Sequence, residues 1–329
     1  MHHPKRRLGW LFLALLMLGF ATPTPTLAWG GGGHRIIARL ALRQIRREAE
    51  AGDRDARLVR KIVYQALAVD HTTLEAASVF PDVVRRTPPY AFADNWHFVS
   101  IPRDKTDYDP AAHCVVKPTA PEGDCVVGGL AHFRKVLLAQ QGVANKEALD
   151  AISFIIHFVG DMHQPLHTSE DLSFIHNGQP GDRGGNFRSV CFLRVSQSGC
   201  TQTFNGERSD KNLHAVWDKF MIMQTGRDDD AYVNELDGRI RGLSAEKLAE
   251  LGAGEPAEWA EGAHAIAAQF AYTPERLKDT DVPHAAQFDR FFFVDRDYQD
   301  TNIVNVEEQL VKASVRLAAY LKQIAHELP

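Results

Sequence analysis

The chain has 329 residues, 44% of them hydrophobic, and a formal net charge of −5 at pH 7. This length and composition are sufficient for one large domain with a buried core. The acidic balance excludes nucleic-acid binding through a broad basic surface, so a phosphate ligand would need a local cluster of cations. Beyond the first 28 residues, no apolar stretch has the length of a membrane span, so we expect no membrane association of the processed chain.

The first 28 residues have the pattern of a secretory signal peptide. Three basic residues at 5–7 precede an apolar run at 8–20, and a small-residue sequence ends at Ala28. We expect cleavage after Ala28, which leaves 301 residues with a net charge of −8. We place this chain in the periplasm or outside the cell. It contains no Asn-x-Ser/Thr sequon, which favours a bacterial source.

Cleavage would make Trp29 the first residue of the mature chain. A free α-amine has a pKa near 7.7–8.0, far below that of a lysine. It can therefore lose its proton at low cost and bind a metal ion together with its own carbonyl oxygen. The alternative is an N-terminus without any special role, and the rest of the chain has to decide between the two.

Helical periodicity dominates the mature chain. The apolar residues of 34–50 lie along one helical face, and the same pattern predicts further helices at 57–69, 126–141, 146–163, 210–224, 229–251, 256–270 and 303–327. Strand-like alternation is limited to 96–101 and 187–204, and the second of these is expected to form a hairpin. Because we find neither a repeat nor a linker, we expect residues 29–329 to form a single all-α domain with a short β-hairpin.

The four cysteines form two pairs that are close in sequence. In an oxidising compartment two local disulfides, Cys114–Cys125 and Cys191–Cys200, are the default interpretation. Zinc ligation by these cysteines is a less favoured alternative, because their spacings of eleven and nine match no zinc knuckle.

Two of the predicted helices carry a histidine and an aspartate four residues apart. His157 and Asp161 form the first pair, and His214 and Asp218 form the second, so each pair shares one helical face and can bind one cation. The alternative is a polar surface pair or a structural histidine. Residues 154–159 are apolar on nearly every side of the first helix, and a buried Asp161 is costly there unless it is paired or bound to a metal.

The sequence after Asp161 brings a further histidine back toward this site. Pro165 ends the helix and turns the backbone, so that His167 can return from a loop. His163 points roughly 160° away from Asp161 by helix geometry, and we interpret it as a structural residue.

Three more segments offer polar side chains. Asp82 follows the sequence Val-Phe-Pro, and His97 lies in Asn-Trp-His-Phe. The glycine-rich segment 181–186 presents the amide of Asn186, although a plain turn explains it equally well.

Taken in order, these motifs resemble those of one family. They are the segment from Trp29 to His34, then Asp82, W-H-F at 96–98, H-F-x-G-D-x-H-Q-P-L-H at 157–167, G-G-N at 184–186 and L-H-x-x-W-D at 213–218. The chain resembles the single-strand-preferring zinc nucleases of fungi and plants, the type I nucleases, which also act as 3′-nucleotidases. That family shares its α-helical fold with bacterial zinc-dependent phospholipase C.

The resemblance implies three Zn²⁺ ions. The ligands of the first ion would be Asp82, His97, His157 and Asp161. The ligands of the second would be His167, His214 and Asp218. The third would take the amine and carbonyl of Trp29, with His34 and the bridging Asp161. Nitrogen and oxygen ligands of this kind suit open catalytic zinc sites. The cluster would also supply the local positive charge that an acidic chain needs to hold a polyanion.

The resemblance also implies roles for the residues around the ions. Asp82 and Asp161 would be catalytic residues that act on the water that attacks phosphorus. Asn186 would donate a hydrogen bond to a phosphoryl oxygen. The second ion would stabilise the leaving O3′, so that the products carry a 5′-phosphate. Phe98 would stack on an unpaired base, which would favour single strands, although it could equally be a core residue.

The position two residues after this phenylalanine departs from the fungal pattern. Ser100 stands where fungal members have a carboxylate that binds the base edge. A serine hydroxyl is a less discriminating partner, so we expect a blurred base preference.

The expected substrates are single-stranded RNA and DNA and 3′-nucleotides, and we expect a monomer without a stable protein partner. One alternative is a zinc-dependent phospholipase C, but its second zinc usually takes glutamate where this chain has Asp218. The other alternative is an exported zinc-binding protein without turnover, since fold alone does not confer activity.

Overall fold

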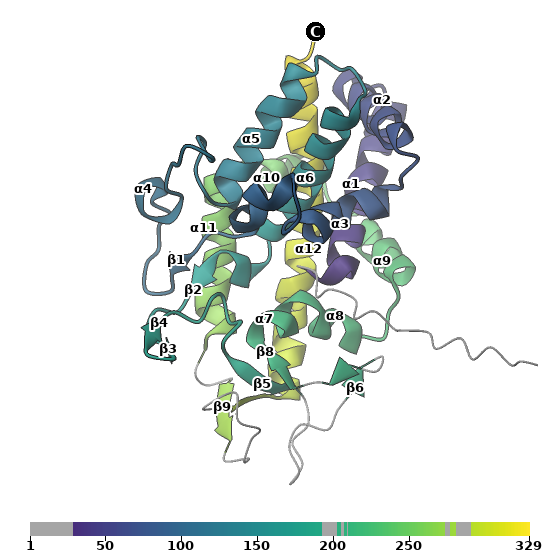
Figure 1. Ribbon diagram of the computed structural model, residues 1–329. Coiled ribbons are helices and arrows are strands. Elements are labelled where there is room, and N and C mark those ends of the chain that lie inside the picture. The colour runs from purple at the N-terminus through teal and green to yellow at the C-terminus, as the bar shows by residue number, and fades with distance from the viewer. Residues whose placement is uncertain (1–28, 193–202, 205–206, 209, 274–276, 281–290) are drawn as a thin grey trace, which may run out of the picture.

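A long C-terminal helix, α12 (Arg296–Glu327), runs through the molecule and organises the fold. The computed structural model describes residues 29–192, 203–204, 207–208, 210–273, 277–280 and 291–329. In Figure 1, α12 is the yellow helix that extends from the C-terminus at the top to the strands at the bottom. α1 (Gly30–Glu50), α2 (Arg54–Val69) and α10 (Ala245–Gly252) pack along it.

The most deeply buried helix is α6 (Lys146–Met162). It begins at Asn145, whose side chain accepts a hydrogen bond from the Ala148 amide at 2.8 Å. Its helical neighbours are α1, α2, α3 (Leu74–Val84), α5 (Val126–Ala139) and α12. Because helices surround it, every residue from 151 to 162 is buried, including the polar ones.

The exposed edges of α1 and α9 (Asp229–Arg241) are joined by charge. Arginines recur on one side of α1 and face acidic residues of α9: Arg35 with Asp229, Arg39 with Asp230, and Arg47 with Asp237. Exposed pairs of this kind contribute at most about 1 kcal/mol each, so apolar packing of the opposite face of α1 dominates.

Shorter helical segments connect these helices. They are η1 (Tyr90–His97), α4 (Pro110–His113), η2 (Pro165–His167), α7 (Leu213–Ala215), η3 (Val216–Phe220), α8 (Met221–Gln224), α11 (Pro256–Ile266) and η4 (Ala267–Ala271). η3 and η4 are single π-helical turns, a conformation that is frequent at functional sites.

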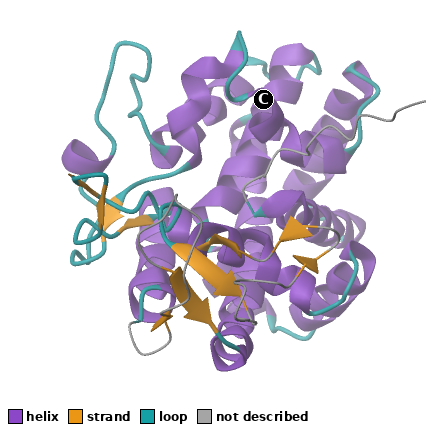
Figure 2. Cartoon of the chain, turned by 60° about the horizontal axis from the view of Figure 1, so that its bottom comes forward, coloured by secondary structure: helices purple, strands orange, loops and turns teal. Residues whose placement is uncertain are grey.

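The strands are short and gather at one end of the helices, as Figure 2 shows. Four of them form a sheet in the order β8 (Asp210–Asn212), β5 (Ser189–Phe192), β10 (Phe291–Val294) and β9 (Leu277–Thr280). β5 and β10 are parallel, and the other two pairings are antiparallel.

The remaining strands form three pairs. β1 (Ile101–Pro102) runs parallel to β2 (Ser169–Glu170), whereas β3 (Ile175–His176) with β4 (Gln179–Pro180) and β6 (Thr203–Phe204) with β7 (Glu207–Arg208) form hairpins.

The predicted fold class, mostly helical with a short β-hairpin, is confirmed, but several boundaries differ. The expected helix at 229–251 is divided at residues 242–244, and the closing helix begins at Arg296 instead of 303. The expected hairpin at 187–204 lies partly outside the described residues, and its described strand, β5, pairs with β8 and β10. α3 was not predicted because it contains Pro81, a residue that usually ends a helix.

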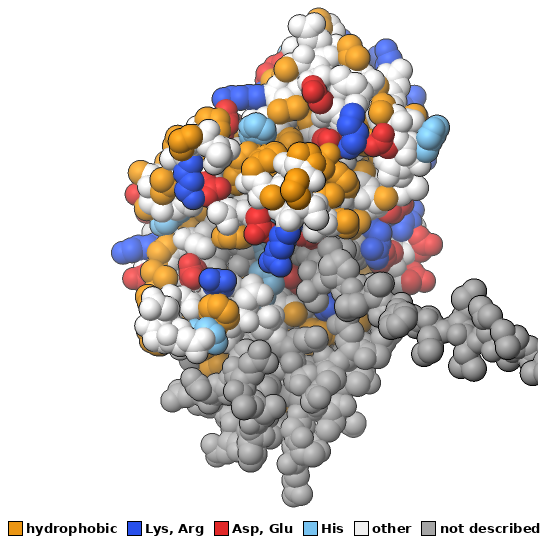
Figure 3. Space-filling model, in the orientation of Figure 1, with side chains coloured by type: hydrophobic (Ala, Val, Ile, Leu, Met, Phe, Trp, Pro, Cys, Tyr) orange, Lys and Arg blue, Asp and Glu red, His pale blue; other side chains and the backbone are white. Residues whose placement is uncertain are grey.

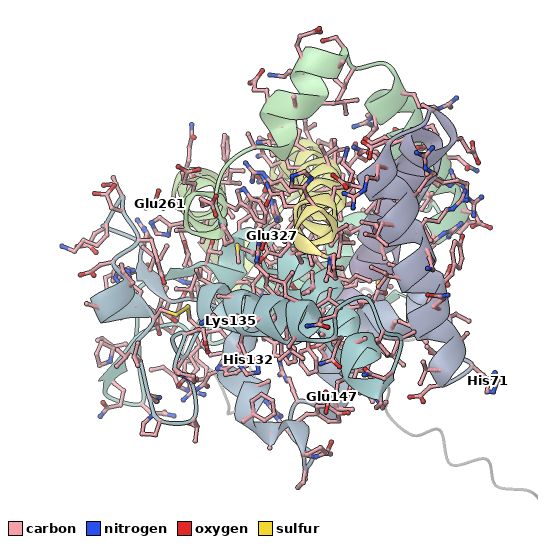
Figure 4. The ribbon with its side chains drawn as sticks, turned by 90° about the horizontal axis from the view of Figure 1, so that it is seen from above. His71, His132, Lys135, Glu147, Glu261 and Glu327 are labelled. Atoms are coloured by element: carbon pink, nitrogen blue, oxygen red, sulfur yellow. A yellow bond between two sulfur atoms is a disulfide. The ribbon has the colours of Figure 1, made fainter. Side chains whose placement is uncertain are left out.

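The disulfide between Cys114 and Cys125 is present and is visible as a yellow bond in Figure 4. The second predicted bridge includes Cys200, which lies outside the described residues, as does the predicted signal peptide. In the second half of α5, Arg134 pairs with Glu327 of α12, and Figure 4 labels Glu327. None of the described helices combines the length and the apolar character that crossing a membrane requires.

Candidate metal centre

α6 carries the residues at the middle of the site. His157 and Asp161 are fully buried on one face of this helix, one turn apart. Their Nε2 and Oδ2 atoms are separated by 3.2 Å. A carboxylate inside such an apolar helix is stable only with partners, and four imidazoles surround it: that of His157 and three from other elements.

Each oxygen of the Asp161 carboxylate faces two of these imidazoles. Oδ2 lies 3.0 Å from Nδ1 of His97, in addition to its contact with His157. Oδ1 lies 3.3 Å from Nε2 of His34 and 3.3 Å from Nδ1 of His167. His167 Nδ1 is hydrogen-bonded to the His97 carbonyl, so the ligand nitrogens beside the carboxylate are those of His97 and His157 at Oδ2 and that of His34 at Oδ1. The carboxylate therefore stands between two groups of ligand nitrogens, the position of a bridging ligand.

α3 adds a second carboxylate to the same centre. Asp82 Oδ1 lies 3.6 Å from both His97 Nδ1 and His157 Nε2. The Arg85 guanidinium, one turn later, lies 3.7 Å from Asp82 and is 27% exposed. Because α3 continues through Pro81, it directs Asp82 inward and leaves Arg85 at the rim.

A second group of ligand atoms lies on the side of η2 and η3. Nε2 of His214 is 3.1 Å from Nε2 of His167 and 3.3 Å from Oδ2 of Asp218. The two imidazole rings are stacked with centroids 4.8 Å apart. The amide of Gln164 donates a hydrogen bond to the other oxygen of Asp218 and fixes its orientation.

The first turn of α1 completes the site. The His34 ring stacks on His157 with centroids 3.8 Å apart, and no larger residue than Gly160 fits beside it, because a Cβ there would lie 2.7 Å from His34 Nδ1. The buried indole of Trp29 donates a hydrogen bond to the Gly160 carbonyl at 2.6 Å. This bond holds Trp29 next to Asp161.

Backbone carbonyls determine which ring nitrogen of each histidine is available. Nδ1 of His157 donates to Ser78 O, Nδ1 of His167 to His97 O, and Nδ1 of His214 to Gly184 O, each at 2.8 Å. Each Nε2 atom then presents its lone pair to the centre. Hydrogen bonds of this kind orient the imidazoles of metal sites and raise their basicity.

The charges of the centre affect one another strongly. Burial opposes ionisation of Asp82, but His157 and His97 outweigh it and lower the pKa of Asp82 to about 2. Burial is likewise outweighed at His157, where Asp161 and Asp82 raise the pKa to about 10. The pKa of His167 falls to about 4, chiefly because of burial. The carboxylates thus favour positive charge at their centre.

Several buried atoms of the centre have no hydrogen-bond partner among the described residues. They are both ring nitrogens of His34, Nε2 of His97 and Oδ1 of Asp161. Three groups of side chains bring ligand atoms within 4.8 Å of one another: His34, Asp82 and His157; His97, His157 and Asp161; and His167, His214 and Asp218. Lone pairs that converge without donors fit metal ions, and nitrogen with carboxylate oxygen fits zinc.

The predicted substrate-binding residues lie around this centre. Phe98 is 42% exposed and follows His97, so its ring is not a core residue, and Ser100 is partly exposed. Asn186 is exposed in the turn whose Gly184 carbonyl holds His214, and its side chain donates to Arg183 O at 2.9 Å. His163 points away from the centre, where its Nε2 atom accepts a hydrogen bond from Arg316 at 2.9 Å.

Two residues near the centre were missed by sequence reasoning. Gln164 was seen only as part of a motif, and nothing in its spacing indicated a contact with Asp218. Arg85 could have been found from its spacing of three from Asp82, which places both on one helical face, if a helix through Pro81 had been expected.

The fold and this centre define a class, the α-helical proteins with a buried histidine–aspartate metal site. Comparison with known families then identifies the group within that class: the S1/P1 Nuclease family matches residues 29–326, and the chain belongs to this family. The predicted family and enzyme class, a nuclease that hydrolyses phosphodiester bonds, are confirmed, and the phospholipase C alternative is not favoured.

Individual relatives are distant but extend over most of the chain. The chain is 25% identical to Endonuclease 5 of Arabidopsis thaliana over 316 residues, which covers 92% of each protein. It is 23% identical to Nuclease P1 of Penicillium citrinum, covering 90% of this chain and 97% of that protein. The similarity to Nuclease S1 of Aspergillus oryzae, 28% identical, covers 60% of this chain and 55% of that protein.

Proposed function

We propose that this chain is an exported zinc-dependent phosphodiesterase. It hydrolyses single-stranded RNA and DNA to products with a 5′-phosphate, dephosphorylates 3′-nucleotides, and acts as a monomer in the periplasm or outside the cell. One observation carries the proposal: four imidazoles surround the buried carboxylate of Asp161, whose Oδ1 atom has no hydrogen-bond donor among the described residues. Family membership directs this metal chemistry to nucleic acids.

Three zinc ions would be held by the convergent side chains. The first is assigned to Asp82, His97, His157 and Asp161, the second to His167, His214 and Asp218, and the third to His34, Asp161 and the amine and carbonyl of Trp29. Distances of 3.0–3.7 Å between the side-chain ligand atoms within these sets support the assignment. Bound zinc supplies positive charge for the phosphate and lowers the pKa of a water toward neutrality.

Asp82, Asp161 and Arg85 act on the groups that take part in the attack on phosphorus. Asp161 belongs to the ligand sets of the first and third ions, and Asp82 accepts a hydrogen bond from the attacking water and orients it. The low pKa of Asp82 keeps this carboxylate ionised, and therefore an acceptor, at neutral pH. Arg85 reaches from the surface to Asp82 and is placed to pair with a phosphoryl oxygen.

Other residues orient the nucleotide. Asn186, in the turn that touches His214, donates a hydrogen bond to the phosphoryl group, while O3′ leaves on the side of the second ligand set. The exposed ring of Phe98 stacks on a base, with Ser100 beside its edge. Only an unpaired base can stack in this way, and the proposed preference for single strands rests on this requirement.

The direct test is hydrolysis of matched single- and double-stranded DNA and RNA by zinc-loaded protein that begins at Trp29. We expect faster cutting of single strands, with 5′-phosphate ends identified by mass spectrometry. His157→Ala should abolish cutting. The control His71→Asn changes an exposed residue just after α2, which Figure 4 labels, and should retain cutting. Equal cutting of duplexes would contradict the stacking role of Phe98, and zinc binding without any cutting would favour the alternative of a zinc-binding protein without turnover.

The proposed role of the Trp29 amine has its own test. A chain with one alanine before Trp29 offers an amide where the amine is required, while the indole can still bind Gly160. We expect this variant to fold, to bind two zinc ions instead of three and to lose most of its activity. Full activity with three bound ions would exclude the amine as a ligand.

A further inference from the structure

Beside the second ligand group, three planar side chains gather at the surface. They belong to the hairpin of β3 and β4 and to the turn that follows it. In Figure 3, hydrophobic, basic and histidine side chains lie side by side over this hairpin, at the lower left. We call His176, Phe187 and Arg183 the surface stack.

The geometry of the surface stack is that of ring-on-ring recognition. The centroids of His176 and Phe187 are 4.0 Å apart, and their planes differ by 20°. The guanidinium carbon of Arg183 lies 5.1 Å from the centroid of Phe187. Flat apolar faces next to a guanidinium are the combination that binds unstacked bases together with their phosphates.

The surface stack is continuous with the proposed catalytic site. The Gly184 carbonyl accepts the hydrogen bond from His214, and the next two residues lead to Asn186. Phe187 is only three residues from Gly184, so their Cα atoms lie within about 11 Å of each other. A strand that leaves the site on this side reaches the surface stack within a few nucleotides.

The charge of Arg183 is available for a ligand. Its side chain is exposed, and no carboxylate among the described residues lies within ion-pair distance of it. The neighbouring Arg188 differs, because it is buried between Asp171 and Asp182 and holds the turn in place. One arginine thus builds the turn, and the other faces solvent.

We propose that the surface stack is a second nucleotide-binding subsite, on the side of His167, His214 and Asp218. The base of one further nucleotide of a single strand stacks on the outer face of His176, whose other face lies on Phe187, and Arg183 binds that nucleotide's phosphate. This inference rests on the proposed function and extends it: the chain favours oligonucleotides over 3′-mononucleotides, because only a longer strand reaches both Phe98 and the surface stack.

The test compares substrates of different length in two variants. His176→Ala removes one ring, and Arg183→Asn removes the cation while tolerating the positive φ of 50° at this position. For an eight-nucleotide single strand we expect KM to rise about fivefold or more in each variant, from the lower end of base-stacking contributions for His176 and from the loss of a charge-assisted hydrogen bond for Arg183. KM for a 3′-mononucleotide and kcat for both substrates should stay within about twofold.

Three controls separate binding from folding. His176→Phe keeps a stacking ring and should restore the wild-type KM. Arg57→Ala changes an exposed residue of α2, far from β3 and β4 in Figure 1, and should leave KM and kcat unchanged. Thermal unfolding shows whether each variant is folded. Equal losses on mononucleotide and oligonucleotide, or no loss on either, would overturn the subsite.

A binding measurement distinguishes failure of the subsite from failure of the proposed function. Fluorescence anisotropy with a phosphorothioate eight-nucleotide strand and zinc-loaded protein requires no turnover. If the wild type cuts no nucleotide yet binds this strand, and His176→Ala weakens binding, the subsite stands and the catalytic proposal falls. Binding that is the same in both variants and the wild type refutes the subsite.

Discussion

Two buried polar clusters in this molecule differ in whether their hydrogen-bond acceptors find donors within the cluster. In the cluster of Asp171, Asp182 and Arg188, the guanidinium donates to both carboxylates, with 2.6 Å between Arg188 Nε and Asp182 Oδ2. The Tyr272 hydroxyl donates to the remaining oxygen of Asp182 at 3.3 Å. In the metal centre, lone pairs of histidines and carboxylates converge instead, and buried atoms of His34, His97 and Asp161 have no partner among the described residues.

The difference separates a structural cluster from a functional one. The first cluster contains its own cation and needs nothing from solution. The second contains acceptors that face acceptors, an arrangement that only an added cation or protons can stabilise. Desolvation and neighbouring charges shift the pKa values there in opposite directions, so burial alone does not describe the site.

The largest expected effect follows from removing the central carboxylate of the metal centre. Asp161→Asn keeps the shape but not the charge between the four imidazoles. We expect loss of bound zinc and at least a thousand-fold loss of activity, or about 4 kcal/mol. Metal analysis and hydrolysis of a single-stranded substrate measure the two effects. Retention of all bound zinc together with full activity would show that Asp161 is not a bridging ligand.

Removing a carboxylate from the cluster of Asp171, Asp182 and Arg188 should lower the stability of the fold instead of the activity. Asp182→Asn leaves the buried Arg188 with one anionic partner, and breaking such a pair costs about 3–5 kcal/mol. Urea unfolding measures the loss, and zinc content at low temperature should be unchanged. The exposed pair of Arg39 and Asp230 provides the control, since Asp230→Asn should cost less than about 1 kcal/mol. Equal costs at both positions would contradict the comparison.

A smaller effect is expected from the residue that orients Asp218. Gln164→Leu removes the donated hydrogen bond, and losses of this kind weaken metal binding about 10–100-fold. Titration with a zinc chelator should show that one ion leaves more easily while the others are unaffected. Gln44→Leu on α1, a buried glutamine outside the centre, is the matched control. Uniform weakening of all ions would argue against a local role.

The smallest expected effect concerns His163, which touches neither cluster. Burial and, next, Arg316 lower its pKa to about 3, so it stays neutral where the unfolded chain, near pKa 6.5, binds a proton. Between pH 6.5 and 3 the unfolded state therefore binds more protons, and stability falls as pH falls. Urea unfolding of the metal-free protein at pH 7 and pH 5 measures this effect. The free energy of unfolding should fall by about 2 kcal/mol more in the wild type than in His163→Gln. Parallel pH profiles would show that His163 titrates normally.

Much of the site could be predicted from the sequence because its key pairs are local. The spacing of four in His157 and Asp161, and again in His214 and Asp218, places each pair on one face in any helix. The apolar residues around His157 also indicated that Asp161 is buried. α3 could not be predicted in this way, since the local preference of Pro81 opposes the helix that packing against α1 and α6 stabilises.

Other contacts depended on the fold. Sequence alone indicated which residues are able to bind a metal, since ligand chemistry belongs to the side chain and helical periodicity to the local backbone. Only the tertiary structure decided that His34 stacks on His157, 123 positions away, and that the carbonyls of Ser78 and Gly184 select the ring nitrogens of His157 and His214. These contacts join segments distant in sequence, and their geometry follows from helix packing, which no local pattern encodes.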